Sequence, residues 1–185
     1  KKGDYAVMQD EQPLNAKPEK IPHLKPAFRA DGSVTAANAS SISDGAAALI
    51  VSSQTHMQQA GLPCRARILG HASHAQEPAW FSTAPIFATR KLLDRLNWRV
   101  EDVDLWEVNE AFAVVPMAFM NELDISGDII NVHGGACALG HPIGASGARI
   151  IVTLLHAMER RDVKRGIAAV CIGGGEGTAI ALERP

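Results

Sequence analysis

Five glycines fall within the seventeen residues from Asn131 to Gly147, and no other segment restricts the possible fold as much. The segment lies between an apolar run at 129–132 and an amphipathic stretch at 146–160 with a helical period, which predicts a turn from a strand into a helix. Such dense glycine permits backbone approaches that a Cβ would block. Turns at the carboxyl ends of strands bind ligands in open α/β sheets. We therefore predict a ligand-binding turn, and the alternative is a tight connection with a helix cap at Ser146.

His141 is the reactive side chain of this turn. Gly140 precedes it and Pro142 follows it, so we expect the imidazole to be held in place while its surroundings stay open. A histidine near its ordinary pKa of about 6.5 is a common general base at neutral pH, and a structural histidine is the alternative. A phosphate loop is excluded, because His141-Pro142 stands where such a loop needs Lys-Ser or Lys-Thr.

From residue 46 onward, predicted strands and helices alternate. Strand patterns cover 46–51, 66–73, 103–108, 129–132, 167–172 and 178–182, and helical patterns cover 53–60, 83–96, 110–123 and 146–160. From residue 66 the order is βαβαβαββ, which implies right-handed crossovers and an α/β fold with a layered, mixed, mostly parallel sheet. Pro116 lies inside the predicted helix 110–123 and is expected to kink it or mark its end.

The first 35 residues are unlike the rest. They contain Pro13, Pro18, Pro22 and Pro26 and show neither a helical nor a strand period, which predicts an extended, loop-rich segment. Such a loop is unusual at the start of a compact domain, so we expect it to lie over another body of protein. With 185 residues, 46% of them apolar, the chain is long enough for one domain and part of a second.

Charge and composition exclude several classes of function. A net charge of −2 with interspersed signs offers no electrostatic footprint for nucleic acid or an anionic membrane. The longest apolar runs, such as Ala111–Met120, are far shorter than the roughly 20 residues that span a bilayer. Cys64, Cys137 and Cys171 are too few and too widely spaced for a disulfide framework, which suits a reducing compartment. We expect a soluble, cytoplasmic protein.

Two further motifs place reactive groups at predicted strand ends. Cys171 ends an apolar strand and precedes the glycines 173–175, which suits a thiol that reaches into a site, and a buried core thiol is the alternative. Asn109 lies between a strand and a helix, either as an amide in an oxyanion hole or as an N-cap. Parallel strands would bring these residues and His141 to one edge of the sheet, which suggests acyl or enolate chemistry.

These motifs resemble those of a known family. Asn109-Glu-Ala-Phe112, Gly140-His141-Pro142 and Cys171-Ile-Gly-Gly-Gly-Glu-Gly177 are similar to the three C-terminal motifs of thiolases, and Ala37–Ser40 and Asp44–Ala46 are similar to the segment that borders the coenzyme A pocket. The similarity covers essentially the whole chain and is greatest to acetyl-CoA acetyltransferases. It implies Claisen condensation of two acetyl-CoA to acetoacetyl-CoA, or the reverse thiolysis, through an acyl-cysteine intermediate.

The resemblance implies a catalytic role for four residues. His141 would activate the nucleophilic cysteine and, with Asn109 acting through water, would bind the thioester oxygen. Cys171 would protonate the leaving enolate in cleavage or remove the α-proton in condensation. The Gly173 N–H would donate to the other oxyanion hole.

Substrate contacts and assembly are implied as well. Ser40 and Phe28 would contact the pantetheine arm, and Phe112 would line the acyl pocket. Coenzyme A thioesters would be the substrates, with no tightly bound cofactor and no metal. The full-length protein would be a homo-oligomer, either a dimer or a tetramer.

The resemblance also divides the chain. Residues 1–42 would be the end of the coenzyme-A-binding loop domain, 43–63 the last elements of the N-terminal thiolase domain, and 64–185 the C-terminal thiolase domain. The family's nucleophile belongs to the N-terminal half, and neither Cys64 nor Cys137 matches it, so we expect both to pack and this chain alone to be inactive.

Two other functions fit the same residues. A 3-ketoacyl-CoA thiolase of fatty-acid β-oxidation shares the motifs and differs mainly in the width of its acyl pocket. For this chain alone, a non-catalytic module that binds coenzyme A or forms an assembly interface agrees with the missing nucleophile. Such a module, however, needs neither His141 nor Cys171.

Overall fold

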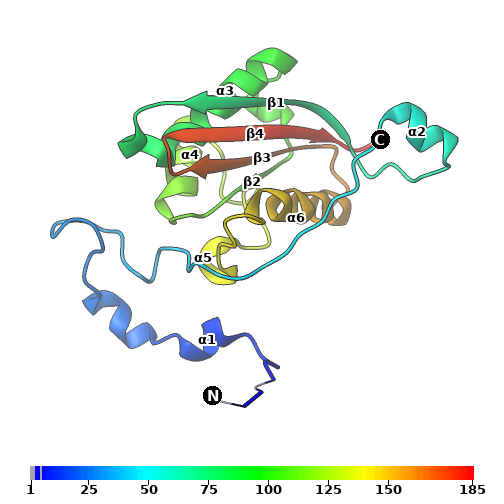
Figure 1. Ribbon diagram of the computed structural model, residues 1–185. Coiled ribbons are helices and arrows are strands. Elements are labelled where there is room, and N and C mark those ends of the chain that lie inside the picture. Colours follow the sequence, from blue (N-terminus) through cyan, green and yellow to red (C-terminus); the bar gives the residue numbers. More distant parts are fainter. Residues whose placement is uncertain (1–2, 5) are drawn as a thin grey trace.

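The computed structural model describes residues 3–4 and 6–185 and is built around a four-stranded sheet (Figure 1). The strands β1 (Arg67–Ala75), β2 (Leu105–Val108), β3 (Arg165–Ile172) and β4 (Glu176–Glu183) have the spatial order β1-β4-β3-β2. β2 and β3 run parallel, whereas β4 is antiparallel to both β1 and β3. The predicted α/β class and mixed sheet are confirmed, but the prediction that the sheet is mostly parallel is wrong.

The short connection between β3 and β4 explains this difference. Only the glycines 173–175 separate the two strands, and parallel neighbours would need a crossover of a dozen or more residues. The turn closes with the Gly175 N–H donating to the Ile172 carbonyl at 3.1 Å. Gly175 has a φ of +97°, which glycine adopts without a steric penalty. Because β4 lies between β1 and β3, two of the three strand pairings are antiparallel.

The predicted strand at 129–132 is present as a short parallel bridge beside β2. Ile130 pairs with Trp106, whose N–H donates to Ile129 and whose carbonyl accepts from the Asn131 N–H at 2.9 Å. The chain then turns at Asn131, with a φ of +45°. The Asn131 side chain continues the pairing, because its Oδ1 accepts from the Val108 N–H at 2.7 Å and its Nδ2 donates to the Val108 carbonyl at 2.8 Å. Asn131 therefore supports the carboxyl end of β2.

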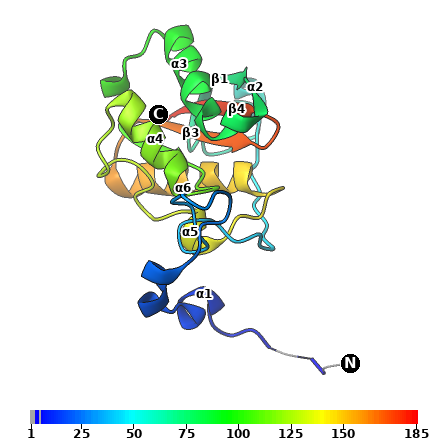
Figure 2. The same ribbon diagram turned by 90° about the vertical axis from the view of Figure 1, so that its left-hand side faces the viewer.

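Helices cover both faces of the sheet (Figure 2). Helices α3 (Ala84–Leu96) and α4 (Val114–Leu123) pack on one face, and α6 (Ser146–Arg161) packs on the other. Because both faces are covered, the central strands are apolar along their length rather than alternating, and both Ala168 and Ala169 of β3 are buried. The largest fully buried apolar side chains of the two cores are Ile86, Leu92, Leu105, Trp106, Phe119, Ile150, Leu154, Met158 and Ile167.

Short helices lie in the N-terminal segment and between the elements of the domain. They are α1 (Glu11–Asn15), η1 (Pro18–His23), α2 (Gln54–Gln59), η2 (Pro78–Thr83), η3 (Val100–Asp102) and α5 (Ala136–Leu139). The predicted helix 110–123 begins only at Val114, so Pro116 occupies its first turn. An N–H in the first turn has no partner within the helix, so a proline there does not kink or end α4. The prediction that Pro116 would do so is wrong.

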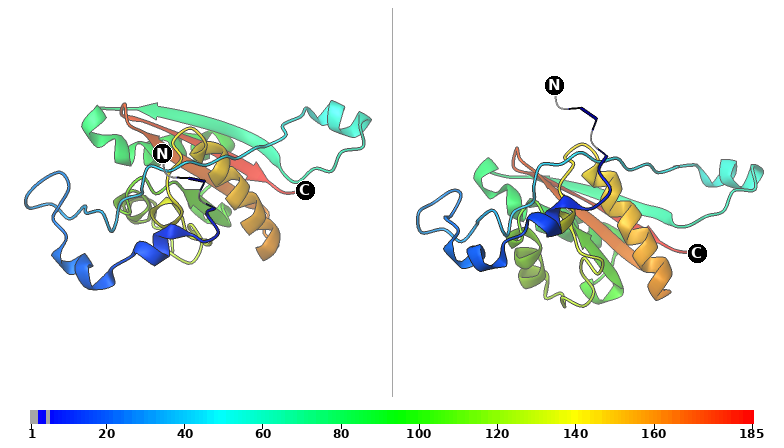
Figure 3. Two further views of the ribbon diagram at one scale, coloured as in Figure 1. Left: turned by 60° about the horizontal axis from the view of Figure 1, so that its bottom comes forward. Right: turned by 90° about the horizontal axis from the view of Figure 1, so that it is seen from below.

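The N-terminal segment before α2, with described residues 3–4 and 6–53, is a long strap at one side of the domain (Figures 1 and 3). Its described residues are mostly loop, as predicted, whereas Lys1, Lys2 and Tyr5 lie outside the described residues. Residues 46–51, predicted to be a buried strand, form no strand, and Ile50 is 96% exposed. A strand needs a neighbour for its backbone N–H and C=O groups, and no strand in the described part of the chain pairs with this segment.

We expect Gly177→Ala to destabilise the domain. A Cβ at Gly177 would lie 2.5 Å from the Ala84 carbonyl carbon and 2.6 Å from the Pro85 nitrogen, which are backbone atoms at the start of α3. Overpacking of this kind costs about 1–3 kcal/mol and should lower the midpoint of chemical denaturation. In the control variant Gly127→Ala, the new Cβ meets nothing within 4 Å. Equal midpoints in the two variants would contradict the close approach of α3 to β4.

Candidate active site

The backbone around His141 is bound to the N-terminal strap. The His141 N–H donates to the Ser41 carbonyl at 2.8 Å, and His141 forms a bridge with Ile42 of the N-terminal strap. Gly140 has a φ of +89°, and a Cβ there would collide with the Ser43 side chain. The predicted need for glycine in this turn therefore has two causes, backbone conformation and close approach.

Hydrogen bonds assign the protons of the His141 ring. Its Nδ1 lies 2.6 Å from Ser146 Oγ, and that hydroxyl donates its own proton to the Pro142 carbonyl at 3.1 Å. With its proton directed to Pro142, the hydroxyl is placed to accept from an Nδ1–H, and we assign this tautomer, in which Nε2 is unprotonated. Burial and the positive charge of Arg149 lower the pKa of His141, so the ring is neutral at neutral pH. The Ser146 hydroxyl therefore bonds to the His141 ring, and it makes no cap bond at the start of α6.

Asn109 directs its amide toward the same nitrogen. Its backbone N–H donates to the Ala169 carbonyl at 2.9 Å, which extends the β2–β3 pairing, and its side chain is fully buried. Asn109 Nδ2 lies 3.4 Å from His141 Nε2. The structure therefore brings these two predicted site residues together. The N-cap alternative does not hold, because α4 begins five residues after Asn109 and its N-cap is Ala113.

Cys171 lies near the carboxyl end of β3. It pairs with Gly177 of β4 and follows Ala169, the residue that binds the Asn109 backbone, by two positions. Its side chain belongs to the core under α3 and α4, and the residue is 8% exposed. Burial raises the pKa of the Cys171 thiol, so it carries its proton at neutral pH. Within the described residues, no hydrogen bond joins Cys171 to His141 or to Asn109.

The glycine turn after β3 leaves open space at Gly173. A Cβ at Gly173 would meet nothing within 4 Å, so the space beside its backbone is open. The turn itself is bound to the residue that follows β1, because the Gln76 N–H donates to the Gly175 carbonyl at 2.9 Å. A Cβ at Gly175 would collide with the Gln76 carbonyl. An N–H in such a turn can face a ligand without interference from side chains.

Ser40 and Phe28 join the strap to the loop after β2. Ser40 Oγ donates to the Ala111 carbonyl at 2.9 Å, and the neighbouring Ala39 forms a bridge with Phe112. The Phe112 ring meets Phe28 edge to face, with centroids 5.6 Å apart. The three predicted substrate-binding residues therefore lie in one small region, close to the Asn109 loop.

Four residues near the site were not identified from the sequence. Ser146 and Arg149 of α6 and Glu107 of β2 surround the His141–Asn109 pair, and Phe81 of η2 contacts Phe112 at a centroid distance of 6.3 Å. The contact between His141 and Ser146 could have been considered from the sequence, because the two residues are only five positions apart. The contact between Arg149 and Glu107 could not, because these residues are 42 positions apart.

Cys137 shows no sign of nucleophilic activation. Burial, and then the nearby Glu110 carboxylate, raise the pKa of Cys137 to about 11, and its N–H donates to that carboxylate at 3.0 Å. All three cysteines are free thiols. In the described part of the chain, no group of three or more His, Cys, Asp or Glu side chains is arranged to hold a metal ion, and no helix is long and apolar enough to cross a membrane.

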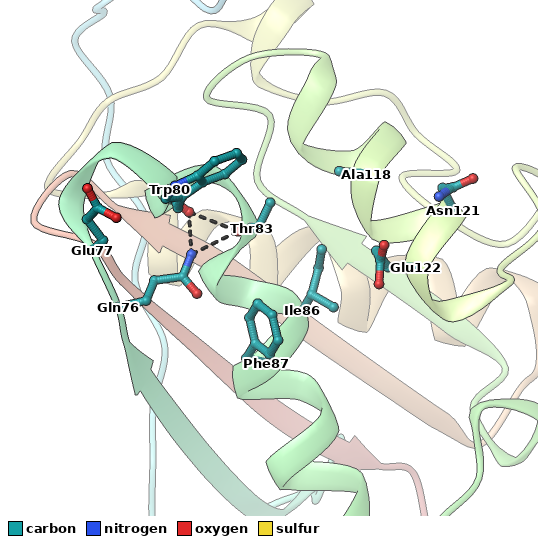
Figure 4. A pocket seen from close by; sticks show the side chains of 9 residues that line it. All are labelled: Gln76, Glu77, Trp80, Thr83, Ile86, Phe87, Ala118, Asn121 and Glu122. Carbon is teal, nitrogen blue, oxygen red and sulfur yellow. Dashed lines mark hydrogen bonds between the residues drawn. The ribbon is translucent and has the colours of Figure 1, made fainter.

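One cavity lies beside the turn that contains His141, and another lies between helices. The first, of about 380 Å³, lies between strap residues 43–47 and residues 142–148 after His141. The second, of about 520 Å³, lies between η2, α3 and α4 (Figure 4). Figure 4 shows Trp80 and Phe87 on its wall, with Gln76 Nε2 donating to Thr83 Oγ1 at 2.8 Å. None of the predicted site residues lines the second cavity.

Comparison with known proteins decides the family. The family model described as "Thiolase, C-terminal domain" matches residues 62–184, and the one described as "Thiolase, N-terminal domain" matches residues 1–55. The chain belongs to the thiolase family. This thiolase chain is 53% identical to an acetyl-CoA acetyltransferase of Pseudomonas aeruginosa, over 95% of the chain and 45% of that relative.

Solved thiolase structures share the fold. The crystal structure of the Bacillus anthracis acetyl-CoA acetyltransferase matches with a TM-score of 0.90 and 45% identity, over 96% of this chain and 45% of that one. Human mitochondrial 3-ketoacyl-CoA thiolase in complex with CoA matches with a TM-score of 0.84 and 37% identity, over 92% of this chain and 43% of that one. The chain thus spans less than half the length of the thiolases it matches here.

Proposed function

We propose that this chain is the C-terminal part of an acetyl-CoA acetyltransferase, which joins two acetyl-CoA into acetoacetyl-CoA and coenzyme A or catalyses the reverse thiolysis. The observation that carries the proposal is the contact between Asn109 Nδ2 and the unprotonated Nε2 of His141, in a chain 53% identical to an acetyl-CoA acetyltransferase. An imidazole lone pair beside an amide donor suits a site that takes a proton from a thiol and then binds a thioester oxygen.

In this proposal, His141 accepts the proton of a nucleophilic cysteine supplied by the N-terminal half. In thiolysis, the resulting thiolate attacks the 3-keto carbonyl of acetoacetyl-CoA, and the C2–C3 bond breaks to leave an acetyl-enzyme and the enolate of acetyl-CoA. Free coenzyme A then takes the acetyl group, its thiol proton passing to the Cys171 thiolate, and the released cysteine thiolate recovers its proton from His141. His141 and Asn109, the latter through water, hold the developing thioester oxyanion.

Cys171 completes the proposed proton transfers. Its thiol carries a proton at neutral pH and gives it to the α-carbon of the enolate, and in condensation its thiolate removes the α-proton instead. A Cβ at Gly173 would meet nothing within 4 Å, so a ligand can approach the backbone there, and the Gly173 N–H donates to the other oxyanion. Fixed donors are effective here because they need no reorganisation as the charge develops.

Other parts of the chain have proposed roles in substrate binding. Ser40 and Phe28 would contact the pantetheine arm of coenzyme A, and Phe112 would line the acyl pocket. Residues 1–42 would end the coenzyme-A-binding loop domain, 43–63 would belong to the N-terminal domain, and 64–185 would form the C-terminal domain. The exposed strand-like segment 46–51 supports this division, because its apolar side chains lack a covering layer within the described residues.

Four further features complete the proposal. The substrates are acyl-CoA molecules, and no tightly bound cofactor is required. The complete protein works in the cytoplasm as a homo-oligomer, either a dimer or a tetramer.

Thiolysis of acetoacetyl-CoA with free coenzyme A tests this function. We expect the complete protein to consume acetoacetyl-CoA and the 185-residue chain alone to be inactive, because the nucleophile lies outside it. Inactivity of the complete protein would contradict the proposed function. Turnover by the chain alone would show that Cys64, Cys137 or Cys171 acts as the nucleophile.

A second candidate is a 3-ketoacyl-CoA thiolase, which the structural match to the human mitochondrial enzyme favours. The two candidates differ in the length of acyl chain that they accept. The edge-to-face contacts of Phe112 with Phe28 and Phe81 fill space near the Asn109 loop and favour a short acyl group. A higher kcat/KM for a long-chain 3-ketoacyl-CoA than for acetoacetyl-CoA would support the second candidate instead.

A further inference from the structure

A buried ion pair lies next to the contact between Asn109 and His141. Arg149 of α6 donates from Nη1 to Glu107 Oε1 at 3.0 Å and from Nη2 to Asn109 Oδ1 at 3.4 Å. The Glu107 side chain is 1% exposed and the Arg149 side chain is 17% exposed. Removing two charges from water costs free energy that their attraction often fails to return, so a buried pair is a poor source of stability. Its place beside the site calls for another explanation.

We propose that Arg149 and Glu107 are positioning residues, which hold the Asn109 amide with its Nδ2 toward His141. This inference rests on the proposed function. A guanidinium only donates hydrogen bonds, so it selects the amide oxygen of Asn109 and leaves the amide nitrogen for the imidazole. Glu107 accepts from the other arm of the same guanidinium and so fixes Arg149 in this place.

Reversing the Asn109 amide would remove both of its side-chain contacts. The Nδ2 group would then face the guanidinium, which is also a donor. In the assigned tautomer, whose ring proton is on Nδ1 beside Ser146 Oγ, Oδ1 would face the lone pair of His141 Nε2. The amide therefore has one favourable orientation, and Arg149 determines it from the side opposite to His141. Lysine cannot replace this arrangement, because a single ammonium lacks the planar fork that binds Glu107 and Asn109 together.

Kinetics of the complete enzyme test the proposal with three variants. Arg149→Met should lower kcat for thiolysis by about 10²-fold while KM changes by less than about threefold, because the lost interaction orients a transition-state donor. Arg149→Met with Glu107→Leu removes the unpaired charge as well. This double variant should therefore unfold at the wild-type midpoint yet keep the low kcat. Arg160→Met is the matched control, since Arg160 is an exposed residue of the same helix.

The double variant keeps the test valid if Arg149→Met alone fails to fold. Wild-type stability with a low kcat would support positioning. Recovery of both stability and kcat in the double variant would overturn it, because the pair would then act only on the fold.

A second readout needs no turnover. Diethyl pyrocarbonate acylates unprotonated imidazole, and peptide mass mapping reports the rate at His141. At about pH 8, where the ring is neutral, Arg149→Met should raise that rate about fivefold, the equivalent of losing one ordinary hydrogen bond to Nε2. If the wild-type enzyme lacks thiolysis but Arg149→Met raises the acylation rate at His141, the proposed function is wrong and the positioning role is supported. If the wild-type enzyme catalyses thiolysis and Arg149→Met changes neither kcat nor the acylation rate at His141, the positioning role is wrong and the proposed function is unaffected.

Discussion

Replacing His141 with alanine is expected to lower thiolysis of acetoacetyl-CoA by the complete enzyme by about 10³-fold or more. The substitution removes a general base and an oxyanion donor together, and each typically contributes at least about 10²-fold. The neutral ring with its unprotonated Nε2 is ready for both roles, because burial and Arg149 lower the pKa of His141 and the assigned tautomer places its proton on Nδ1 beside Ser146. Acetylation of the enzyme by acetyl-CoA should be lost as well, since the nucleophile would keep its proton.

Steady-state turnover and incorporation of labelled acetyl groups measure these two effects. His156→Ala is the matched control, because His156 is an exposed histidine of α6 next to Glu159. It should leave both quantities unchanged. A His141→Ala enzyme that keeps its fold and turns over within about tenfold of the wild-type rate would contradict the assigned role.

Replacing Cys171 with serine is expected to lower turnover by about 10²–10⁴-fold, the usual contribution of a positioned acid or base. Serine is close to cysteine in size, so the core around β3 should be preserved, but its hydroxyl is a far weaker acid than a thiol. Acetylation by acetyl-CoA should survive, because in the proposed mechanism that half-reaction uses His141 and the nucleophilic cysteine of the N-terminal half. The variant should therefore form acetyl-enzyme and then fail to make or break the carbon–carbon bond.

Exchange of the methyl protons of acetyl-CoA with deuterated water isolates the step assigned to Cys171. Wild-type enzyme should catalyse this exchange, and Cys171→Ser should not. Cys64→Ser is the control, since Cys64 is a free cysteine that the proposed mechanism does not use. Loss of acetylation in Cys171→Ser would indicate that Cys171, rather than a cysteine outside this chain, carries the acyl group.

Most of the fold follows from local patterns. The helical periods at 83–96 and 146–160 correspond to α3 and α6, and the strand patterns after residue 66 correspond to β1, β3, β4, the bridge beside β2 and β2 itself. Strand direction does not follow from such patterns, because it depends on how the connections run in space. The turn at 173–175 is too short for a crossover, and it makes β4 antiparallel to β3.

Residues 46–51 show the limit of local pattern. Their apolar side chains and strand propensity predict a buried strand, yet burial and pairing need a partner that is not among the described residues. Pro116 shows the same limit on a smaller scale. Its effect on α4 depends on whether it lies in the first turn or the interior, and that depends on where the helix begins.

The sequence by itself pointed to the proposed reactive residues of this protein and to the family to which the chain belongs. Dense glycine around His141 and after Cys171 marks sites where backbone must approach a ligand or another segment, and that requirement can be detected in one dimension. The tertiary structure alone decided which side chains hold those residues in place. Glu107 and Arg149 are 42 positions apart, and the orientation of Asn109 and the proton position on His141 depend on contacts between β2, the glycine turn and α6. Hydrogen bonds across such separations form only when packing brings the elements together, so no local pattern encodes them.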